Sequence, residues 1–340
     1  MPHRSRLLLL AALIPAALQA QSVDLMYHTY GLSFGDSRLV HGIRINFRDD
    51  RMKDVWGVNA TVWKAYTPAR GSVHGMALGL PVTTARNISG IGAGVFGAGA
   101  EESFHGIGGG LVGVGAGGDL TGIFVGGVGA GAGGNMTGIT IGGIGAGAGG
   151  NMTGITVGGI GAGAGGNMTG FSVGVIGAGA GGNMKGIAIG GIGAGAGGNM
   201  TGLTIGGVGV GAGGDVNGVL FSGVGAGAGG TLRGLAVGLV GVGAPKIRAL
   251  TLGLSAGGAD VVGGVIAPIY FTVRNDGQDG GYVKGVTISG WNDIRGEQHG
   301  LSIAVLNTAW ELRGWQFGLL NYAANNPKGL RLLPLFNRRW

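Results

Sequence analysis

The sequence of 340 residues contains no cysteine. A chain without cysteine cannot be joined by a disulfide after export, and it cannot carry the cysteine-linked lipid of a lipoprotein. The stability of the fold must therefore come from packing and backbone hydrogen bonds alone.

Charge is also scarce, because only 11% of the residues are Asp, Glu, Lys or Arg. Between Ile107 and Gly230 the only charged residues are Asp119, Lys185 and Asp215. The formal net charge of +7 consequently belongs to the two ends of the chain. A nucleic-acid-binding protein needs a basic stripe, which the middle of this chain does not have. We therefore expect no nucleic acid among its partners.

In place of these residues the chain has 86 glycines, which follow a repeat of 16 residues from Gly106 to Gly234. One repeat begins at Gly138 and ends at Thr153. A short fixed period predicts one structural unit that is stacked many times. The first glycine of each repeat can be followed, with spacing that varies toward both ends, through Gly42, Gly57, Gly75, Gly90, Gly106, Gly122, Gly138, Gly154, Gly170, Gly186, Gly202, Gly218, Gly234, Ala249 (the glycine replaced), Gly264, Gly285, Gly300, Gly314 and Gly329, with Gly31 as a possible further member.

The organisation of the chain follows from this repeat. We expect a signal peptide at 1–20, degenerate N-terminal repeats or a cap at 21–105, regular repeats at 106–244 and degenerate C-terminal repeats or a cap at 245–340. The signal peptide is indicated by Arg4 and Arg6 ahead of an apolar run at 7–14 and by small residues before position 21. All six tryptophans lie in the two flanks, where we expect them to cover the ends of the core.

Glycine at this density disfavours helices, so the repeat predicts an all-β protein. Thr137, Ile139 and Ile141 share one parity, whereas Ala146 and Ala148 share the other, and the phase changes at 142–143. Each unit is thus two short strands with two corners, or one bent strand. The pattern favours a parallel β-solenoid of ~16-residue coils, and a transmembrane β-barrel or an antiparallel β-meander is the alternative.

In a solenoid, we expect the larger apolar residues to fill the interior and the smaller polar ones to face outward. The expected interior column is Ile139, Ile155, Ile187 and Leu203. The expected outward column is Thr140, Thr156, Ser172, Ala188 and Thr204. A third column, of uncharged amides that hydrogen-bond along one corner, is Asn135, Asn151, Asn167, Asn183 and Asn199. We prefer this ladder to glycosylation for the sequons among these residues.

The sequence offers no catalytic, cofactor-binding or metal-binding residues that we would select. Asp119 and Asp215 resemble the aspartates of calcium-binding β-rolls, but the same position is Asn in the five repeats between them, and calcium needs several carboxylates. The cluster of Glu101, Glu102 and His105 is the nearest approach to a catalytic group, and no nucleophile accompanies it. We expect no enzyme activity and no cofactor.

Near the C-terminus two segments, at 300–307 and 314–321, repeat the pattern Gly-Leu/Trp-x-x-x-x-Leu-Asn, and a third at 329–337 begins with Gly-Leu and ends with Asn but is one residue longer. This pattern resembles the repeat units of leptospiral-type bacterial surface-repeat proteins. The resemblance covers the last ~55 residues, and the Gly-Ala-rich middle departs from it. That family is exported and has no assigned biochemical activity, so the resemblance implies location.

These observations predict an exported, glycine-rich, non-enzymatic repeat protein of the cell envelope with a structural or adhesive role. We expect it in the outer membrane, on the cell surface or secreted. Its expected partners are the outer membrane or surface ligands, and also other copies of itself. The alternative function is an outer-membrane β-barrel channel.

Overall fold

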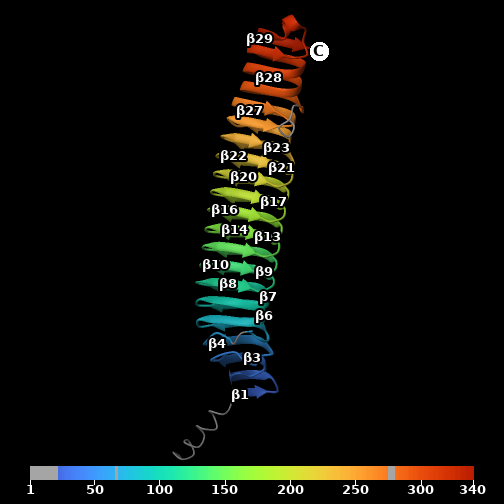
Figure 1. The fold of residues 1–340 in the computed structure, drawn as a ribbon. Helices are drawn as coiled ribbons and strands as arrows, with labels where there is room; N and C mark the ends of the chain where they lie inside the picture. The colour runs from blue at the N-terminus through green and yellow to red at the C-terminus, as the bar shows by residue number, and fades with distance from the viewer. Residues whose placement is uncertain (1–21, 66–67, 275–279) are drawn as a thin grey trace, which may run out of the picture. The chain divides into compact units, whose positions relative to one another are not determined.

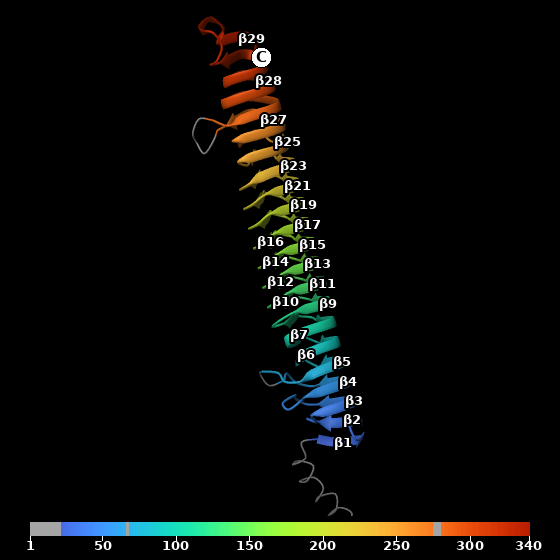
Figure 2. The same ribbon diagram turned by 90° about the vertical axis from the view of Figure 1, so that its right-hand side faces the viewer.

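The computed structural model describes residues 22–65, 68–274 and 280–340, so the expected signal peptide lies outside the described residues. The chain divides into two compact units at Gly158/Gly159, which are considered one at a time below. In both units the β-strands form a series of stacked coils (Figures 1 and 2).

The first unit contains thirteen strands. Their bounds are β1 Ser22–Tyr27, β2 Tyr30–Gly35, β3 Leu39–Asn46, β4 Asp54–Thr61, β5 Ser72–Gly79, β6 Val82–Gly94, β7 Gly97–Gly110, β8 Gly113–Ala116, β9 Leu120–Gly126, β10 Gly129–Ala132, β11 Met136–Gly142, β12 Gly145–Ala148 and β13 Met152–Gly158.

The second unit contains the remaining strands and one short 3-10 helix. Their bounds are β14 Gly161–Ala164, β15 Met168–Gly174, β16 Gly177–Ala180, β17 Met184–Gly190, β18 Gly193–Ala196, β19 Met200–Gly206, β20 Gly209–Ala212, β21 Val216–Ser222, β22 Gly225–Ala228, β23 Thr231–Gly238, β24 Gly241–Gly243, β25 Lys246–Leu252, β26 Ser255–Gly258, β27 Asp260–Val273, β28 Tyr282–Ala323, η1 Lys328–Leu330 and β29 Leu332–Arg339.

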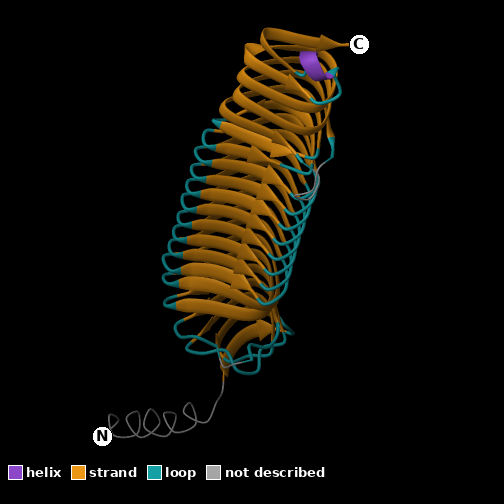
Figure 3. Cartoon of the chain, turned by 45° about the horizontal axis from the view of Figure 1, so that its top comes forward, coloured by secondary structure: helices purple, strands orange, loops and turns teal. Residues whose placement is uncertain are grey.

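One regular coil consists of a longer strand, such as β11, and a shorter strand, such as β12. The two strands are separated by a corner at Gly143–Ile144, where the sequence changes phase. Strands of the same kind stack into a longer sheet and a shorter sheet, and loops line the edges between them (Figure 3). The alternative of two strands and two corners is thus confirmed for the regular repeats, whereas β28 runs through several repeats as one continuous bent strand.

Neighbouring coils pair in parallel and in register. Met136 lies opposite Met152, and Ala130 lies opposite Ala146, which is an offset of one 16-residue repeat. The predicted parallel β-solenoid is therefore confirmed, because both alternative architectures need antiparallel neighbours. Antiparallel pairs occur only at the margins of the described chain, between β1 and β2 in the first unit and between β28 and β29 in the second.

The repeat glycines are explained by their backbone geometry. Gly138 has a φ of 117°, which side chains rarely adopt, and a Cβ placed on it would lie 2.0 Å from the carbonyl oxygen of Gly122. Gly122 has the same relation to Gly106. Each repeat glycine therefore allows the next coil to approach closely.

The expected assignment of inside and outside is wrong for the longer sheet. Ile139 and Ile155 are 36% and 43% exposed, whereas Thr140 and Thr156 are 1% and 2% exposed. In the second unit Ile187 likewise lies outside, Leu203 is half-buried, and Ser172, Ala188 and Thr204 lie inside. The physical reason is that the interior is too thin for large side chains on every strand: a Cβ on inward Gly142 would already lie 1.9 Å from the Gly145 carbonyl.

The core is instead built from a column two residues before each repeat glycine and from the alanines of the shorter sheet. In the first unit the column consists of Val40, Val55, Val73, Ile88, Phe104, Leu120, Met136 and Met152, all nearly completely buried. Ala146 and Ala148 of β12 close the coil from the opposite side. This arrangement gives a narrow core of methyl and thioether groups.

The position of the repeat glycine also needs two corrections near the C-terminus. Gly263, and not Gly264, aligns with Gly285, because the register of β27 and β28 sets their pairing. Gly329 lies in η1, and the strand after it runs antiparallel to β28, so it does not begin another parallel coil. Gly31 does align with Gly42 and is a true member of the series.

The tryptophans lie mostly at the surface. Five of the six are 43–83% exposed, so these five are not part of the buried core. The outermost described strands of the two units, β1 and β29, are antiparallel additions. An antiparallel edge strand reverses the chain direction and ends the parallel series.

Candidate interaction surfaces

Ionisable groups do not gather into a chemical centre. Among the described ranges no group of three or more His, Asp or Glu side chains could hold a metal ion. Glu102 pairs with Arg86 at 2.7 Å, and Glu101 accepts a hydrogen bond from the backbone N–H of Ala69. His105 lies exposed on the outer side of β7, so these three residues do not form one site.

The predicted asparagine ladder is present in each unit. In the first unit the backbone N–H of Asn151 donates to Oδ1 of Asn135 at 2.9 Å, and that of Asn135 donates to Oδ1 of Asp119 at 2.6 Å. In the second unit the N–H groups of Asn183 and Asn199 donate to the preceding asparagine at 2.8 Å. The aspartates thus act as members of the ladder.

Asp215 continues the ladder of the second unit. The hydrogen bond from the backbone N–H of Thr231, together with Arg233, lowers the pKa of the Asp215 carboxyl. A carboxylate in this position therefore remains charged at neutral pH and accepts the same bond as asparagine.

The asparagines of the C-terminal motif form a different ladder. Asn307 and Asn321 are completely buried, and the amide of Asn307 donates to Oδ1 of Asn321 at 2.8 Å. Asn292 donates in turn to Asn307 at 2.8 Å. They follow their repeat glycine by seven residues, which places them inside the coil and away from the exposed corner. Asn307 and Asn321 therefore do not continue the corner ladder of the regular repeats.

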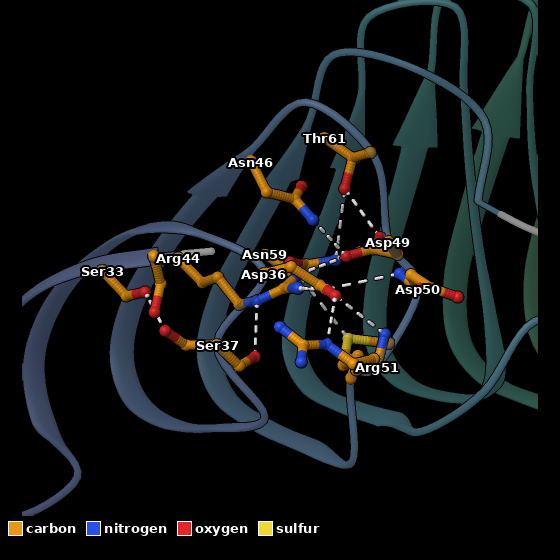
Figure 4. A network of polar contacts seen from close by, with 12 residues as sticks. Ser33, Asp36, Ser37, Arg44, Asn46, Asp49, Asp50, Arg51, Asn59 and Thr61 are labelled. Atoms are coloured by element: carbon orange, nitrogen blue, oxygen red, sulfur yellow. Dashed lines mark hydrogen bonds and ion pairs between the residues drawn. The ribbon is translucent and has the colours of Figure 1, made fainter. Parts of the chain in front are cut away.

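A buried polar network occupies the interior of the N-terminal coils (Figure 4). Arg44 is completely buried and donates to Asn59 at 2.7 Å, to Asp36 at 2.6 Å and to Asp49. Asp49 also accepts from Thr61 at 2.8 Å. Because the buried charges of Arg44 and Asp49 each have several hydrogen-bond partners, we interpret this network as a structural replacement for an apolar core.

The outer face of the longer sheet carries exposed apolar columns. Two columns lie one and three residues after the repeat glycine, and a third lies at the following corner. In the first unit the column one residue after the glycine is Ile91, Ile107, Ile123, Ile139 and Ile155. The column three residues after it includes Val125 and Ile141, and the corner column is Phe96, Val112, Val128 and Ile144. Each of these side chains is at least 36% exposed. The columns form a continuous apolar surface, because neighbouring strands lie about 4.8 Å apart.

A further column lies one residue before the repeat glycine, on the same outer face. In the N-terminal coils it is aromatic: His41 stacks on Tyr30 with ring centroids 4.7 Å apart, and Trp56 stacks on His74 at 4.2 Å. In the second unit the same column is rich in cations. Its charged members there are Lys185, Arg233, Arg248, Lys284 and Arg313, with His299 among them.

The outer face of the shorter sheet has almost no side chains. Gly129 and Gly131 point outward, and a Cβ on either would have its nearest neighbour at 3.5 or 3.6 Å. These glycines are thus not required by the space within the coil. Their effect is a flat surface of exposed backbone.

Two of the hollows in the described surface have basic side chains in their lining. The larger, about 670 Å³, lies in the first unit beside the segments that precede β4 and β5 and has Arg38, Lys53 and Arg70 in its lining. The second, about 460 Å³, lies in the second unit, between Arg248, Val262, Tyr282, Lys284 and His299. Basic groups line both hollows, and Glu101 and Glu102 also line the larger one.

Comparison with models of known protein families, with curated protein sequences and with solved structures yields no match. No helix in the described part of the chain is long and apolar enough to span a membrane. The sequence alone did not indicate the apolar outer face or the cationic column, because both depend on which parity faces outward. The residue two positions before each repeat glycine is apolar in almost every coil. This pattern could have indicated which parity faces inward.

Proposed function

We propose that this chain is a non-enzymatic repeat protein of the bacterial cell envelope, exported and held at the outer membrane or cell surface, where it has a structural and adhesive role. The observation that carries the proposal is the continuous apolar surface on the outer face of the longer sheet. In the first unit its side chains are each at least 36% exposed and span several neighbouring coils, and an extended exposed apolar surface of this kind marks a site of interaction. A surface of this size is a place of attachment.

The contacts between neighbouring coils support a structural role. Each coil is joined to the next by backbone hydrogen bonds, by the asparagine ladder and by close contact between the repeat glycines. Repeat arrays of this kind extend by adding equivalent units, and their surfaces extend with them. Repetition would thus give many weak attachment points on one chain, which strengthens adhesion by multivalency.

The proposal is tested by fractionation of the native cells, followed by mass spectrometry of the mature N-terminus. We expect the protein in the outer envelope fraction with its N-terminus near Gln21. A chain that lacks residues 1–20 is the matched control and should remain in the cytoplasm. Recovery of the natural protein from the cytoplasm with Met1 in place would contradict the proposal.

A further inference from the structure

The second unit combines cations and apolar side chains on one face of one sheet. Arg248 and Lys284 belong to the column before the repeat glycine. On the same strands Leu250 and Val286, two residues further on, are 46% and 43% exposed. Since side chains at this spacing point to the same face, β25 and β28 each carry a cation beside an apolar group.

The smaller hollow lies within this cationic column. Val262 lies opposite Lys284 in the register of β27 and β28, and its short side chain leaves space between the longer neighbours. The hollow measures about 460 Å³ and is also bordered by Tyr282 and His299. A volume of this size lies within the range of ~300–1,000 Å³ that is usual for small-ligand sites.

Two cations at this hollow are not neutralised. Within the described ranges neither Arg248 nor Lys284 has an ion pair or a side-chain hydrogen bond. Their neighbours in the column differ: Arg233 pairs with Asp215 at 3.2 Å, and His299 contacts Glu297 at 2.8 Å. The hollow is thus the place where positive charge is available to a ligand.

The apolar surface beside the hollow continues over several coils. Its members are Leu250, Ile266, Val286, Ile288, Ile303 and Phe317, each 39–46% exposed. A ligand that fits both features has an anionic group for the cations and a hydrocarbon part for the columns. Phosphate is well suited to arginine and lysine, which bind it through charge-assisted hydrogen bonds.

We propose that this face of the second unit binds the surface of an anionic phospholipid layer, with a lipid phosphate in the hollow between Arg248 and Lys284 and the apolar columns at the boundary between headgroups and acyl chains. The inference rests on the proposed function, because it names what the adhesive face contacts. Proteins that lie on membranes combine apolar groups and cations in this way. A second copy of the chain fits this face less well, since two cationic columns would then face each other.

The test is flotation of the purified mature chain with vesicles. Vesicles of phosphatidylcholine are compared with vesicles that also contain phosphatidylglycerol. We expect binding to the anionic vesicles that weakens as salt increases, because surface charges are screened. The double variant Arg248→Gln/Lys284→Gln should bind roughly tenfold to thirtyfold more weakly, as expected for the loss of two cations at an anionic surface.

Two controls separate the possible explanations. The variant Arg38→Gln/Lys53→Gln removes the same charge from the hollow of the first unit, and it should bind like the natural chain. Ile288→Ser removes one exposed apolar group and should also weaken vesicle binding. Circular dichroism is expected to be unchanged in all variants, because the altered side chains are exposed.

The source of the phosphate is tested by competition with glycerol phosphate in solution. We expect little displacement, because the free headgroup lacks the hydrocarbon part. Complete displacement, equal binding by the double variant, equal binding to neutral vesicles or capture only by an acidic protein would each overturn the inference. If fractionation still places the protein in the envelope after such a result, the proposed function stands and only the lipid contact is lost.

Discussion

The regular coils and the N-terminal coils of the first unit follow the same backbone path with different interiors. Four positions after Met136 in a regular coil the buried residue is Thr140, whereas four positions after Val40 in an N-terminal coil it is Arg44. Both coils keep the repeat glycine and a buried apolar residue two positions before it. The comparison teaches that these two positions specify the coil, while the position two residues after the glycine accepts very different chemistry.

The largest effect is expected from replacing Arg44, whose buried side chain distinguishes the N-terminal coils from the regular ones. Replacement by Met leaves the buried carboxylate of Asp49 without its cation, which we expect to cost about 3–5 kcal/mol in the free energy of unfolding of these coils. Hydrogen exchange should show early opening of residues 39–61, with less effect on residues 120–158. Arg51→Gln is the control, since the Arg51 side chain is 39% exposed and contacts Asp36 only at 3.4 Å. Equal protection in Arg44→Met and the natural chain would show that the network is dispensable.

Substitutions at the neighbouring residues Ile155 and Thr156 test which side of the longer strand faces the buried interior. Thr156→Asp places an unpaired carboxylate in the interior, and we expect it to cost about 3 kcal/mol or more. Ile155→Asp changes a side chain that is 43% exposed, and it should cost less than about 1 kcal/mol. Urea unfolding followed by circular dichroism measures both. The reverse order would restore the interior that we first expected from the sequence.

Alanine substitutions at two glycines compare the space available in the longer and the shorter sheet. Gly138→Ala forces a Cβ toward the carbonyl of Gly122 at a positive φ, and strain of this kind costs about 1–3 kcal/mol. Gly131→Ala adds the same methyl group to the open face of the shorter sheet, so the change should stay within about 0.5 kcal/mol. Thermal unfolding of the two variants under the same conditions gives the difference. Similar losses in both would contradict the special role of the repeat glycine.

The smallest effect concerns acid in the second unit. Burial acts to raise the pKa of Asp293, but hydrogen bonds from Arg274 and Tyr270 and the charges of Arg295 and Arg274 outweigh it, so the pKa is lowered. A lowered pKa in the folded state stabilises the fold above the unfolded-state pKa, near 4, and this contribution is lost as the pH falls through the folded value.

The natural chain should therefore lose stability between neutral pH and the acid range more steeply than Asp293→Asn. Unfolding by urea at a series of pH values measures the two slopes. Glu311→Gln is the control, because the Glu311 side chain is 40% exposed in its pair with Arg313. Parallel pH profiles for Asp293→Asn and the natural chain would contradict the expected contribution.

The repeat made the architecture predictable, but it left the orientation open. The 16-residue period, the phase change at 142–143 and the asparagine column predicted the coil, the corner and the ladder. Parity could not decide between Ile139 and Thr140, because both faces of the longer strand repeat equally well. The usual rule that large apolar residues lie inside failed for these strands, since a regular coil buries alanines, a small residue such as Thr140 and a longer side chain such as Met136, while Ile139 lies outside.

The candidate sites were harder to predict, because they arise from departures from the repeat. The hollow near Val262 depends on the register of β27 and β28, which the misplaced repeat glycine at Gly264 obscured. The partners of Arg44 come from two coils and from the segment between them, so no local motif marks them. Long-range contacts of this kind have no signature in one sequence.

The direction of the asparagine ladder has a consequence for how the chain is made. In each described link the acceptor belongs to the earlier coil and the donor is the backbone N–H of the later one, as in Asn151 to Asn135 and Asn199 to Asn183. A coil that has already formed thus offers an oriented acceptor before its successor arrives. Order would then spread from the N-terminus toward the C-terminus, so that each coil can fold onto the preceding one while the chain is still being synthesised.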